Sequence, residues 1–177
     1  MKSILIIPLI TIYFGVLSFH SSALSIGADP ALDNLTNFQV NTPDMVSAGL
    51  PNREQFEALK KEGVFNVVDL IPGDRSEEFK LMKTLDLQYQ NIAVEWDNPT
   101  LENFDDYVIA MQRFEQNGGI TLTHCKLNWR GAVFTYLYRV THLYEPEAVA
   151  KKDLDATWQP NETWQRFIED VKEKYKS

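Results

Sequence analysis

Cysteine is almost absent from the sequence, since Cys125 is the only one among 177 residues. The chain therefore cannot form an internal disulfide, and Cys125 is an inert core residue, a partner in an intermolecular disulfide, or a functional thiol. Histidine is scarce as well, with three residues in the chain. One cysteine and so few histidines do not supply a zinc ligand set at a recognised spacing, so we expect neither a metal nor an organic cofactor.

Basic side chains are also in deficit. The sequence has 17 lysine and arginine residues against 25 aspartate and glutamate residues, which gives a formal net charge of −8. Binding to nucleic acid or to anionic lipid requires a basic surface, so we expect neither of them as a partner. The chain has no internal repeat, low-complexity tract or Gly/Ser-rich linker. These absences favour a single domain.

The one long hydrophobic run lies at the N-terminus. Residues 4–19 are almost all apolar, Lys2 is the only charge near them, and the small residues of 21–23 follow. This pattern predicts a signal peptide over residues 1–23. A membrane anchor is disfavoured because the run is short and no basic stop-transfer cluster follows it. We expect a periplasmic or secreted protein without stable membrane association after cleavage.

The rest of the chain alternates predicted strands and helices. We expect an irregular lead-in over residues 24–44, which contains Pro30 and Pro43, and one domain over residues 45–177. Apolar and β-branched runs predict strands at residues 45–48, 64–71, 87–93 and 120–123; apolar spacing with capping residues predicts helices within residues 52–63, 76–85, 100–118, 132–143, 147–156 and 161–175. This order predicts an α/β fold with a central, mostly parallel sheet of about four strands flanked by helices.

The segment THCKLNWRGAV, residues 123–133, is the strongest candidate for a functional site. A strand delivers Cys125 to its carboxyl end, where parallel sheets bind ligands. A helix that begins near Arg130 directs its free N–H groups and its positive dipole end toward the loop, which favours a bound anion and a thiolate. Arg130 can bind two oxygens of an oxyanion, and His124 can hydrogen-bond the loop backbone and hold its shape.

This pattern also carries a family resemblance. His124 and Cys125 followed by Arg130 resemble the signature of the cysteine-dependent protein phosphatases, particularly the small dual-specificity-like ones. The segments SAGLPNREQFEALKKEGVFNVVDLI, VEWDNPT, HCKLNWRGAVFTYLYRV and WQPNETWQRFI together look like a bacterial phosphatase-like group. That group is similar to a domain found fused to metallo-β-lactamase-like hydrolases. The resemblance covers residues 44–170 and implies a phosphatase-like fold and a cysteine-dependent phosphatase activity.

The resemblance also implies residue roles. Cys125 is the expected nucleophile, which forms a phosphocysteine, and Arg130 is expected to bind the phosphoryl oxygens. The main-chain N–H groups of the loop are expected to complete the phosphate cradle, and they belong to Lys126, Leu127, Asn128, Trp129, Arg130 and Gly131. Asp97 in the segment EWDNP is the first candidate for the general acid, Glu95 the second and Asp74 the third. The expected substrate is a phosphorylated molecule or another small oxyanion.

Two departures from the phosphatase pattern leave alternatives open. Four residues separate Cys125 from Arg130 where the family has five, and the usual loop glycine is absent, although Asn128 can adopt a left-handed conformation. Gly131 stands where a hydroxyl residue normally follows the arginine. A six-residue loop counted from the cysteine is typical of rhodanese-like sulfurtransferases, in which Cys125 would carry a persulfide. A non-catalytic protein that binds an anion or phosphate is the third interpretation.

Overall fold

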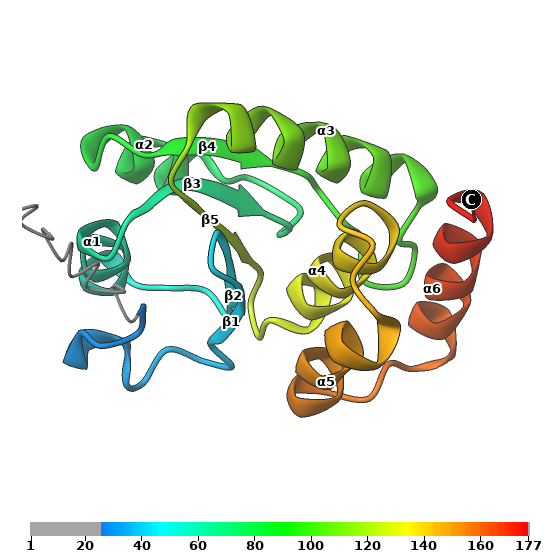
Figure 1. Ribbon diagram of the computed structural model, residues 1–177. Coiled ribbons are helices and arrows are strands. Elements are labelled where there is room, and N and C mark those ends of the chain that lie inside the picture. The colour runs from blue at the N-terminus through cyan, green and yellow to red at the C-terminus, as the bar shows by residue number, and fades with distance from the viewer. Residues whose placement is uncertain (1–25, 177) are drawn as a thin grey trace, which may run out of the picture.

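The computed structural model describes residues 26–176 and shows one α/β domain (Figure 1). The predicted signal peptide, residues 1–23, lies outside the described residues. Five strands form one sheet in the order β1-β2-β5-β3-β4, with bounds β1 Gln39–Thr42, β2 Met45–Ala48, β3 Val64–Asp69, β4 Gln88–Asn91 and β5 Ile120–His124. The strand β1 pairs antiparallel with β2, and all other pairs are parallel. The predicted α/β class and mostly parallel sheet are confirmed.

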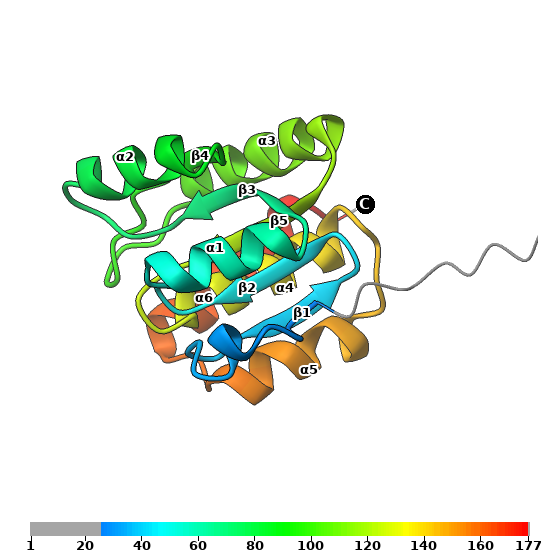
Figure 2. The same ribbon diagram turned by 90° about the vertical axis from the view of Figure 1, so that its left-hand side faces the viewer.

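Helices cover both faces of this sheet. Their bounds are α1 Arg53–Lys61, α2 Ser76–Thr84, α3 Leu101–Asn117, α4 Trp129–Thr141, α5 Glu147–Thr157 and α6 Glu162–Lys174, and a 3-10 turn, η1, spans Pro30–Leu32. Buried side chains fall into two clusters, one with α1 and η1 and the other with α3, α4 and α6. Neighbouring strand residues alternate between them, since Val67 belongs to the first cluster and Val68 to the second. Figure 2 shows α1 in front of the sheet, with α4 and α6 behind it.

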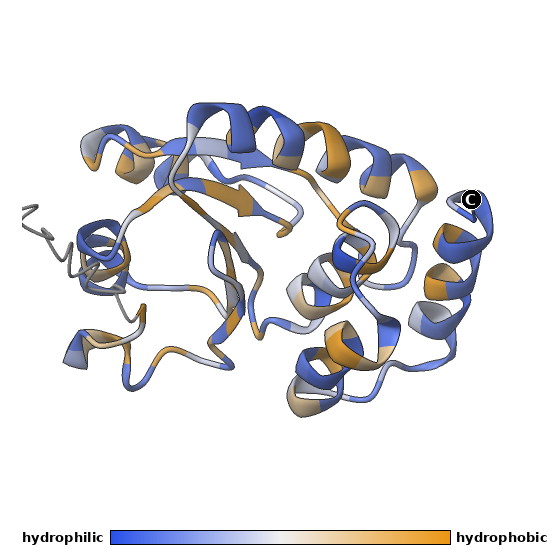
Figure 3. Ribbon diagram, in the orientation of Figure 1, coloured by the Kyte–Doolittle hydropathy of each residue, from blue (hydrophilic) through white to orange (hydrophobic). Residues whose placement is uncertain are grey.

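The helix starts follow the predicted capping residues. The Asn52 side chain accepts a hydrogen bond from the N–H of Gln55, and the Gln55 side chain accepts one from the N–H of Asn52. Thr100 forms the same kind of capping box at the start of α3, and Asn161 caps α6. Such caps each stabilise a helix by about 1 kcal/mol. The strand β3 that follows α1 is largely hydrophobic, as expected for a strand covered on both faces (Figure 3).

The predicted irregular lead-in differs from the structure in one element. Residues 39–42 form β1, which adds a fifth strand to the predicted sheet of about four. A two-residue turn at Pro43 and Asp44 folds β1 back onto β2, with Val40 opposite Val46. The sequence of β1 is polar and is followed by proline, so it has no strand periodicity of its own. Within residues 26–176 no helix is both long and apolar enough to cross a membrane.

Candidate active site

The candidate loop lies at the carboxyl end of the central strand. β5 runs parallel between β2 and β3, and its last residue, His124, is in register with Ala48 and Asp69. The N–H of Cys125 continues the ladder by donating to the carbonyl of Ala48 at 3.3 Å. Cys125 is 1% exposed, and the helix α4 begins four residues later at Trp129. The structure therefore has the predicted arrangement of strand, cysteine loop and helix.

Asn128 replaces the glycine that the loop lacks. Its backbone is left-handed, with φ 62° and ψ 8°, as its side-chain chemistry allows. Its buried side chain donates to the carbonyl of Asn37 at 2.7 Å and to Ser47 Oγ at 3.0 Å. A Cβ atom at Gly131 would lie 2.3 Å from Asn128 Oδ1. The glycine after the arginine is therefore required by the packing of Asn128, which accounts for the absent hydroxyl residue.

The first turn of α4 leaves its hydrogen-bond donors unused. The Asn128 side chain does not cap the helix, because its amide nitrogen is bonded to Asn37 and Ser47. No described residue accepts a hydrogen bond from the backbone N–H groups of Trp129, Arg130 or Gly131. These groups carry the positive end of the helix dipole, and three residues separate the first of them from Cys125 in the chain. They are therefore available to an anion.

Arg130 also keeps its donors free. Arg53, Arg75, Arg139 and Arg166 all form ion pairs in the described part of the chain. Arg130 forms none there, and its buried Nε atom has no hydrogen-bond partner. The guanidinium carbon lies 5.3 Å from the centre of the Trp96 ring, within the range of a cation–π interaction. An aromatic ring thus holds the charge of Arg130 without consuming its hydrogen bonds.

Trp96 belongs to a cluster that includes every tryptophan of the chain. Its ring centre lies 5.3 to 5.6 Å from those of Trp129, Trp158 and Trp164. Trp164 Nε1 also donates to the carbonyl of Trp96 at 3.1 Å. This cluster brings the segment EWDNP against the start of α4, although Trp96 and Trp129 are 33 positions apart in the sequence. Sequence reasoning missed this cluster. The signal that could have indicated it is that the chain has only four tryptophans and that they lie in or beside the segments of the family resemblance, at positions 96, 129, 158 and 164.

The general-acid candidates occupy different positions. Asp97 and Glu95 flank Trp96 and are exposed, and the ring of Trp96 itself lies 5.6 Å from that of Trp129 at the start of α4. Asp74 instead accepts a hydrogen bond from the N–H of Ser76, which lowers the pKa of its carboxyl group. A lowered pKa disfavours Asp74 as a proton donor, in keeping with its place as the third candidate. Asp97 and Glu95 remain predictions for the role of general acid.

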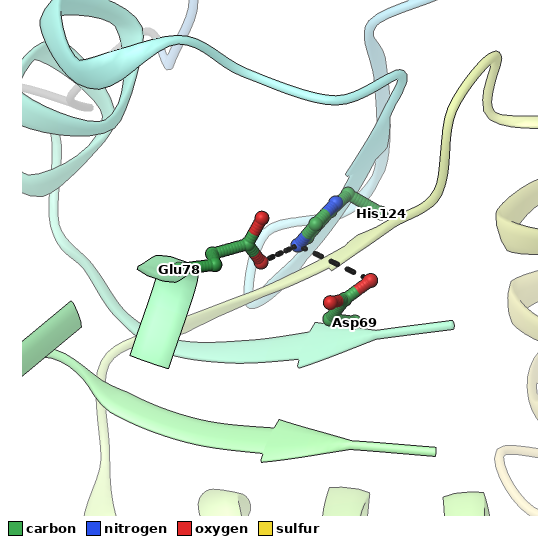
Figure 4. Close-up of side chains that lie close together, drawn as sticks. All are labelled: Asp69, Glu78 and His124. Carbon is green, nitrogen blue, oxygen red and sulfur yellow. Dashed lines mark ion pairs between the residues drawn. The ribbon is translucent and has the colours of Figure 1, made fainter. Parts of the chain in front are cut away.

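His124 faces away from the loop. Its ring is fully buried on the other side of the sheet, edge-on to Phe56, and no hydrogen bond joins it to the backbone of the described loop. Figure 4 shows the ring directed at Glu78 from α2 and Asp69 from β3. Nε2 lies 2.9 Å from Glu78 Oε1 and 3.9 Å from Asp69 Oδ1, both within the range of an ion pair with a protonated ring. The predicted direct support of the loop by this side chain is therefore wrong.

The two carboxylates near His124 are shared with Arg75. Arg75 Nε donates to Asp69 Oδ2 at 2.5 Å, and its Nη2 donates to Glu78. Burial alone would lower the pKa of Arg75, but the hydrogen bond and charge of Asp69 outweigh it and raise that pKa. Burial, together with the charge of Asp69, raises the pKa of Tyr89, whose hydroxyl donates to Asp69 at 2.7 Å. Asp69, Glu78, Arg75 and Tyr89 form a network of ion pairs and hydrogen bonds at the carboxyl end of the sheet.

The same network contains the one set of potential metal ligands among the described residues. Asp69, Glu78 and His124 offer ligand atoms within 4.8 Å of one another. Sequence reasoning missed this set because Glu78 is 46 residues from His124 and its spacing matches no metal motif. Arg75 pairs with both carboxylates and offsets one of their two negative charges. We therefore describe this set as an ion-pair network.

Comparison with solved structures relates the whole domain to phosphatases. A phosphatase of the DUF442 family from Shewanella putrefaciens is 30% identical, with a TM-score of 0.71 over 83% of this chain and 98% of that chain. TpbA from P. aeruginosa is 18% identical, with a TM-score of 0.63 over 76% of this chain and 84% of that chain. The catalytic domain of the PP-IP phosphatase SIW14 from S. cerevisiae is 16% identical, with a TM-score of 0.63 over 76% and 85%. No family model and no curated protein matches the sequence.

Proposed function

The chain belongs to the phosphatase family DUF442, and from this premise we propose that it hydrolyses phosphomonoesters through a covalent phosphocysteine on Cys125. One observation carries the proposal: unused hydrogen-bond donors surround the loop that bears the only cysteine. They are the Arg130 guanidinium and the N–H groups of the first turn of α4. Donors of this kind stabilise the oxygens of a phosphoryl group in the transition state.

The proposed first step transfers the phosphoryl group to sulfur. The Cys125 thiolate attacks phosphorus in line with the leaving oxygen, so that an S–P bond forms as the P–O bond breaks. Arg130 and the N–H groups hold the three non-bridging oxygens throughout. Asp97 gives its proton to the leaving oxygen, which departs as an alcohol.

The second step returns the enzyme to its starting state. Water attacks phosphorus, and Asp97, now a carboxylate, accepts a proton from it. The S–P bond breaks, inorganic phosphate leaves and the Cys125 thiolate is restored. The proposed steps require no cofactor, because Cys125, Arg130, Asp97 and the N–H groups of the loop carry out each transfer.

Two solved relatives support an oxyanion ligand. TpbA has been crystallised with phosphotyrosine, and SIW14 has been crystallised with citrate. Both share the fold of this chain at low identity, so they support the class of ligand. We infer that this chain also takes a small phosphorylated molecule or a phosphorylated residue.

The length of the loop supports a second candidate. Cys125 to Arg130 is six residues, the length typical of rhodanese-like sulfurtransferases. In that reaction the Cys125 thiolate would attack the outer sulfur of a thiosulfate-like donor, so that a persulfide forms on Cys125 as the S–S bond of the donor breaks and a sulfite-like anion leaves, with Arg130 on the donor oxygens. No general acid would be needed, so the two functions differ in whether Asp97 matters.

The first experiment is hydrolysis of p-nitrophenyl phosphate by the reduced protein between about pH 5 and 7.5, a range in which such acid–base catalysis is observed. We expect turnover that vanishes in Cys125→Ser. In Asp97→Asn we expect a larger loss for esters with poor leaving groups, and Glu95→Gln tests the second candidate for the general acid in the same way. Turnover that persists in Cys125→Ser contradicts the proposal. Absence of turnover together with sulfur transfer from thiosulfate to cyanide would assign the sulfurtransferase reaction instead.

We further propose that residues 1–23 direct export to the periplasm or medium. The support is their sequence: an apolar run followed by small residues at a cleavage position. Cell fractionation of the full-length protein, with mass analysis of the mature N-terminus, tests this. An intact N-terminus in the cytoplasmic fraction would contradict it.

A further inference from the structure

The segment that precedes β1 contacts the cysteine loop directly. Asn37 Nδ2 donates to the carbonyl of Leu127 at 2.8 Å, and Asn128 Nδ2 donates to the carbonyl of Asn37 at 2.7 Å. These two bonds join residues 90 and 91 positions apart in the sequence. Both asparagines have a left-handed backbone, with φ 48° at Asn37 and 62° at Asn128. The side chain of each asparagine therefore donates a hydrogen bond to a backbone carbonyl of the segment that contains the other asparagine.

A second set of backbone bonds surrounds this pair. The N–H of Gly49 donates to the carbonyl of Thr36 at 2.6 Å, and the N–H of Leu50 donates to the carbonyl of Lys126 at 3.3 Å. Gly49 lies so close that an added Cβ would be 2.7 Å from the Thr36 side chain and 3.0 Å from the Lys126 carbonyl. The end of β2 is thus fixed between the N-terminal segment and the cysteine loop.

These bonds set the direction of the loop peptides. The carbonyls of Lys126 and Leu127 both point out of the loop, toward Leu50 and Asn37. In a planar trans peptide the N–H points opposite to the carbonyl, so the N–H of Leu127 points to the other side of the loop. No described residue accepts a hydrogen bond from it there. Outward-facing carbonyls and an unused N–H are what an anion cradle needs.

We propose that Asn37 and Asn128 form a clamp that positions the Cys125–Arg130 loop for anion binding. Longer phosphate loops have a glycine and a fifth residue between the cysteine and the arginine. In this shorter loop the hydrogen bonds of Asn37 and Asn128 hold the left-handed turn instead, because they tie it to the segment that precedes β1. Asn37 and Asn128 are positioning residues, since they act through the loop peptides and touch no reacting atom. The anion-binding part of this inference rests on the proposed function, whereas the clamp itself rests on the contacts alone.

Alkylation of Cys125 provides a readout that does not depend on activity. Cys125 is the only cysteine and is 1% exposed, so its reaction rate with iodoacetamide in the native protein reports loop opening. Asn37→Asp keeps the size of the side chain and tolerates the left-handed backbone, but its carboxylate cannot donate to Leu127. Asn128→Gly keeps the backbone conformation and removes the side-chain bonds. Asn34→Asp, at an exposed position in the same segment, controls for the added charge.

We expect alkylation to be about five times faster in Asn37→Asp and faster still in Asn128→Gly, consistent with the loss of one or more hydrogen bonds. Inorganic phosphate, followed by tryptophan fluorescence, should bind the same variants more weakly by a similar factor. Asn34→Asp should match the original protein in both measurements, and circular dichroism should show all three folded.

The outcomes separate the clamp from the proposed function. Original alkylation rates in folded Asn37→Asp and Asn128→Gly would overturn the clamp. If Asn128→Gly does not fold, Asn37→Asp alone decides, because its side chain is exposed and its loss leaves the core intact. Faster alkylation without phosphate binding in any variant would support the clamp and contradict the anion site.

Discussion

Two arginines lie at the carboxyl end of the sheet, and they are held in opposite ways. Arg75 pairs with Asp69 and Glu78, two largely buried carboxylates. Arg130 has no carboxylate partner among the described residues and lies against the Trp96 ring. Both arginines are partly buried, so they differ in their interaction partners and not in their burial. The charge of Arg75 is compensated inside the protein, whereas that of Arg130 has no carboxylate partner among residues 26–176 and is, as we propose, available to a ligand.

The contrast follows from the two faces of β5. Neighbouring residues on a strand point to opposite faces, and at its end His124 faces the Arg75 network while Cys125 belongs to the core cluster under α4. The charged side chains of the Arg75 network therefore lie on one face of β5. The hydrogen-bond donors without a partner belong to the first turn of α4, which comes after Cys125 in the chain. We infer that the Arg75 network contributes to stability and Arg130 to ligand binding, and the predictions below test that division.

The largest expected effect is on catalysis at Arg130. We expect Arg130→Ala to lower kcat/KM for p-nitrophenyl phosphate by about 10³, since it removes a donor to the phosphoryl oxygens. Arg130→Lys should rescue little, because an ammonium group does not offer the two parallel donors of a guanidinium. The free energy of unfolding should barely change in either variant. Steady-state kinetics and urea denaturation measure both, with the exposed Arg166→Ala as control.

The division between the arginines fails if Arg130→Lys keeps full activity, because a simple positive charge would then suffice. It also fails if Arg130→Ala unfolds as easily as a variant of Arg75. Either outcome would assign Arg130 a structural role.

The next effect is on stability at Arg75. Arg75→Met keeps most of the apolar stem but leaves Asp69 and Glu78 without their cation. We expect the free energy of unfolding to fall by about 3 kcal/mol, the lower end for a broken buried ion pair, because Arg75 is partly exposed. Urea denaturation of Arg75→Met against Arg53→Met, whose ion pair is exposed, measures the difference. A change below 1 kcal/mol would mean that the network contributes little to stability.

Most of the fold could be predicted because its signals are local. Residues 64–69 form a strand through a run of apolar and β-branched residues, and Asn52 and Thr100 start helices through their own side chains. The strand β1 could not be predicted, since its polar sequence is stabilised by pairing with β2 and has no periodicity.

The candidate site divides in the same way. Cys125 and Arg130 could be predicted because strand, loop and helix are contiguous, and the left-handed turn at Asn128 follows from its side chain. The direction of His124, the clamp from Asn37 and the ring beside Arg130 depend on contacts between distant segments. No single-sequence pattern encodes such contacts, so these three features come from the structure.

The smallest expected effect is on phosphate binding when the Trp96 ring, which contacts Arg130 in place of a carboxylate, is changed. A cation–π contact at 5.3 Å is worth about 1 kcal/mol when partly exposed, or about fivefold in an equilibrium constant. We therefore expect Trp96→Leu to weaken phosphate binding and raise KM about fivefold with little change in kcat, whereas Trp96→Phe, which keeps a ring, should lose less. Calorimetry with inorganic phosphate measures this without relying on tryptophan fluorescence, and thermal unfolding shows how far the loss of ring packing alone destabilises each variant. If Trp96→Leu and Trp96→Phe bind phosphate equally well, the ring face contributes nothing to Arg130. Arg130 would then be held by the backbone of α4, and the contrast with Arg75 would rest on the absent carboxylate alone.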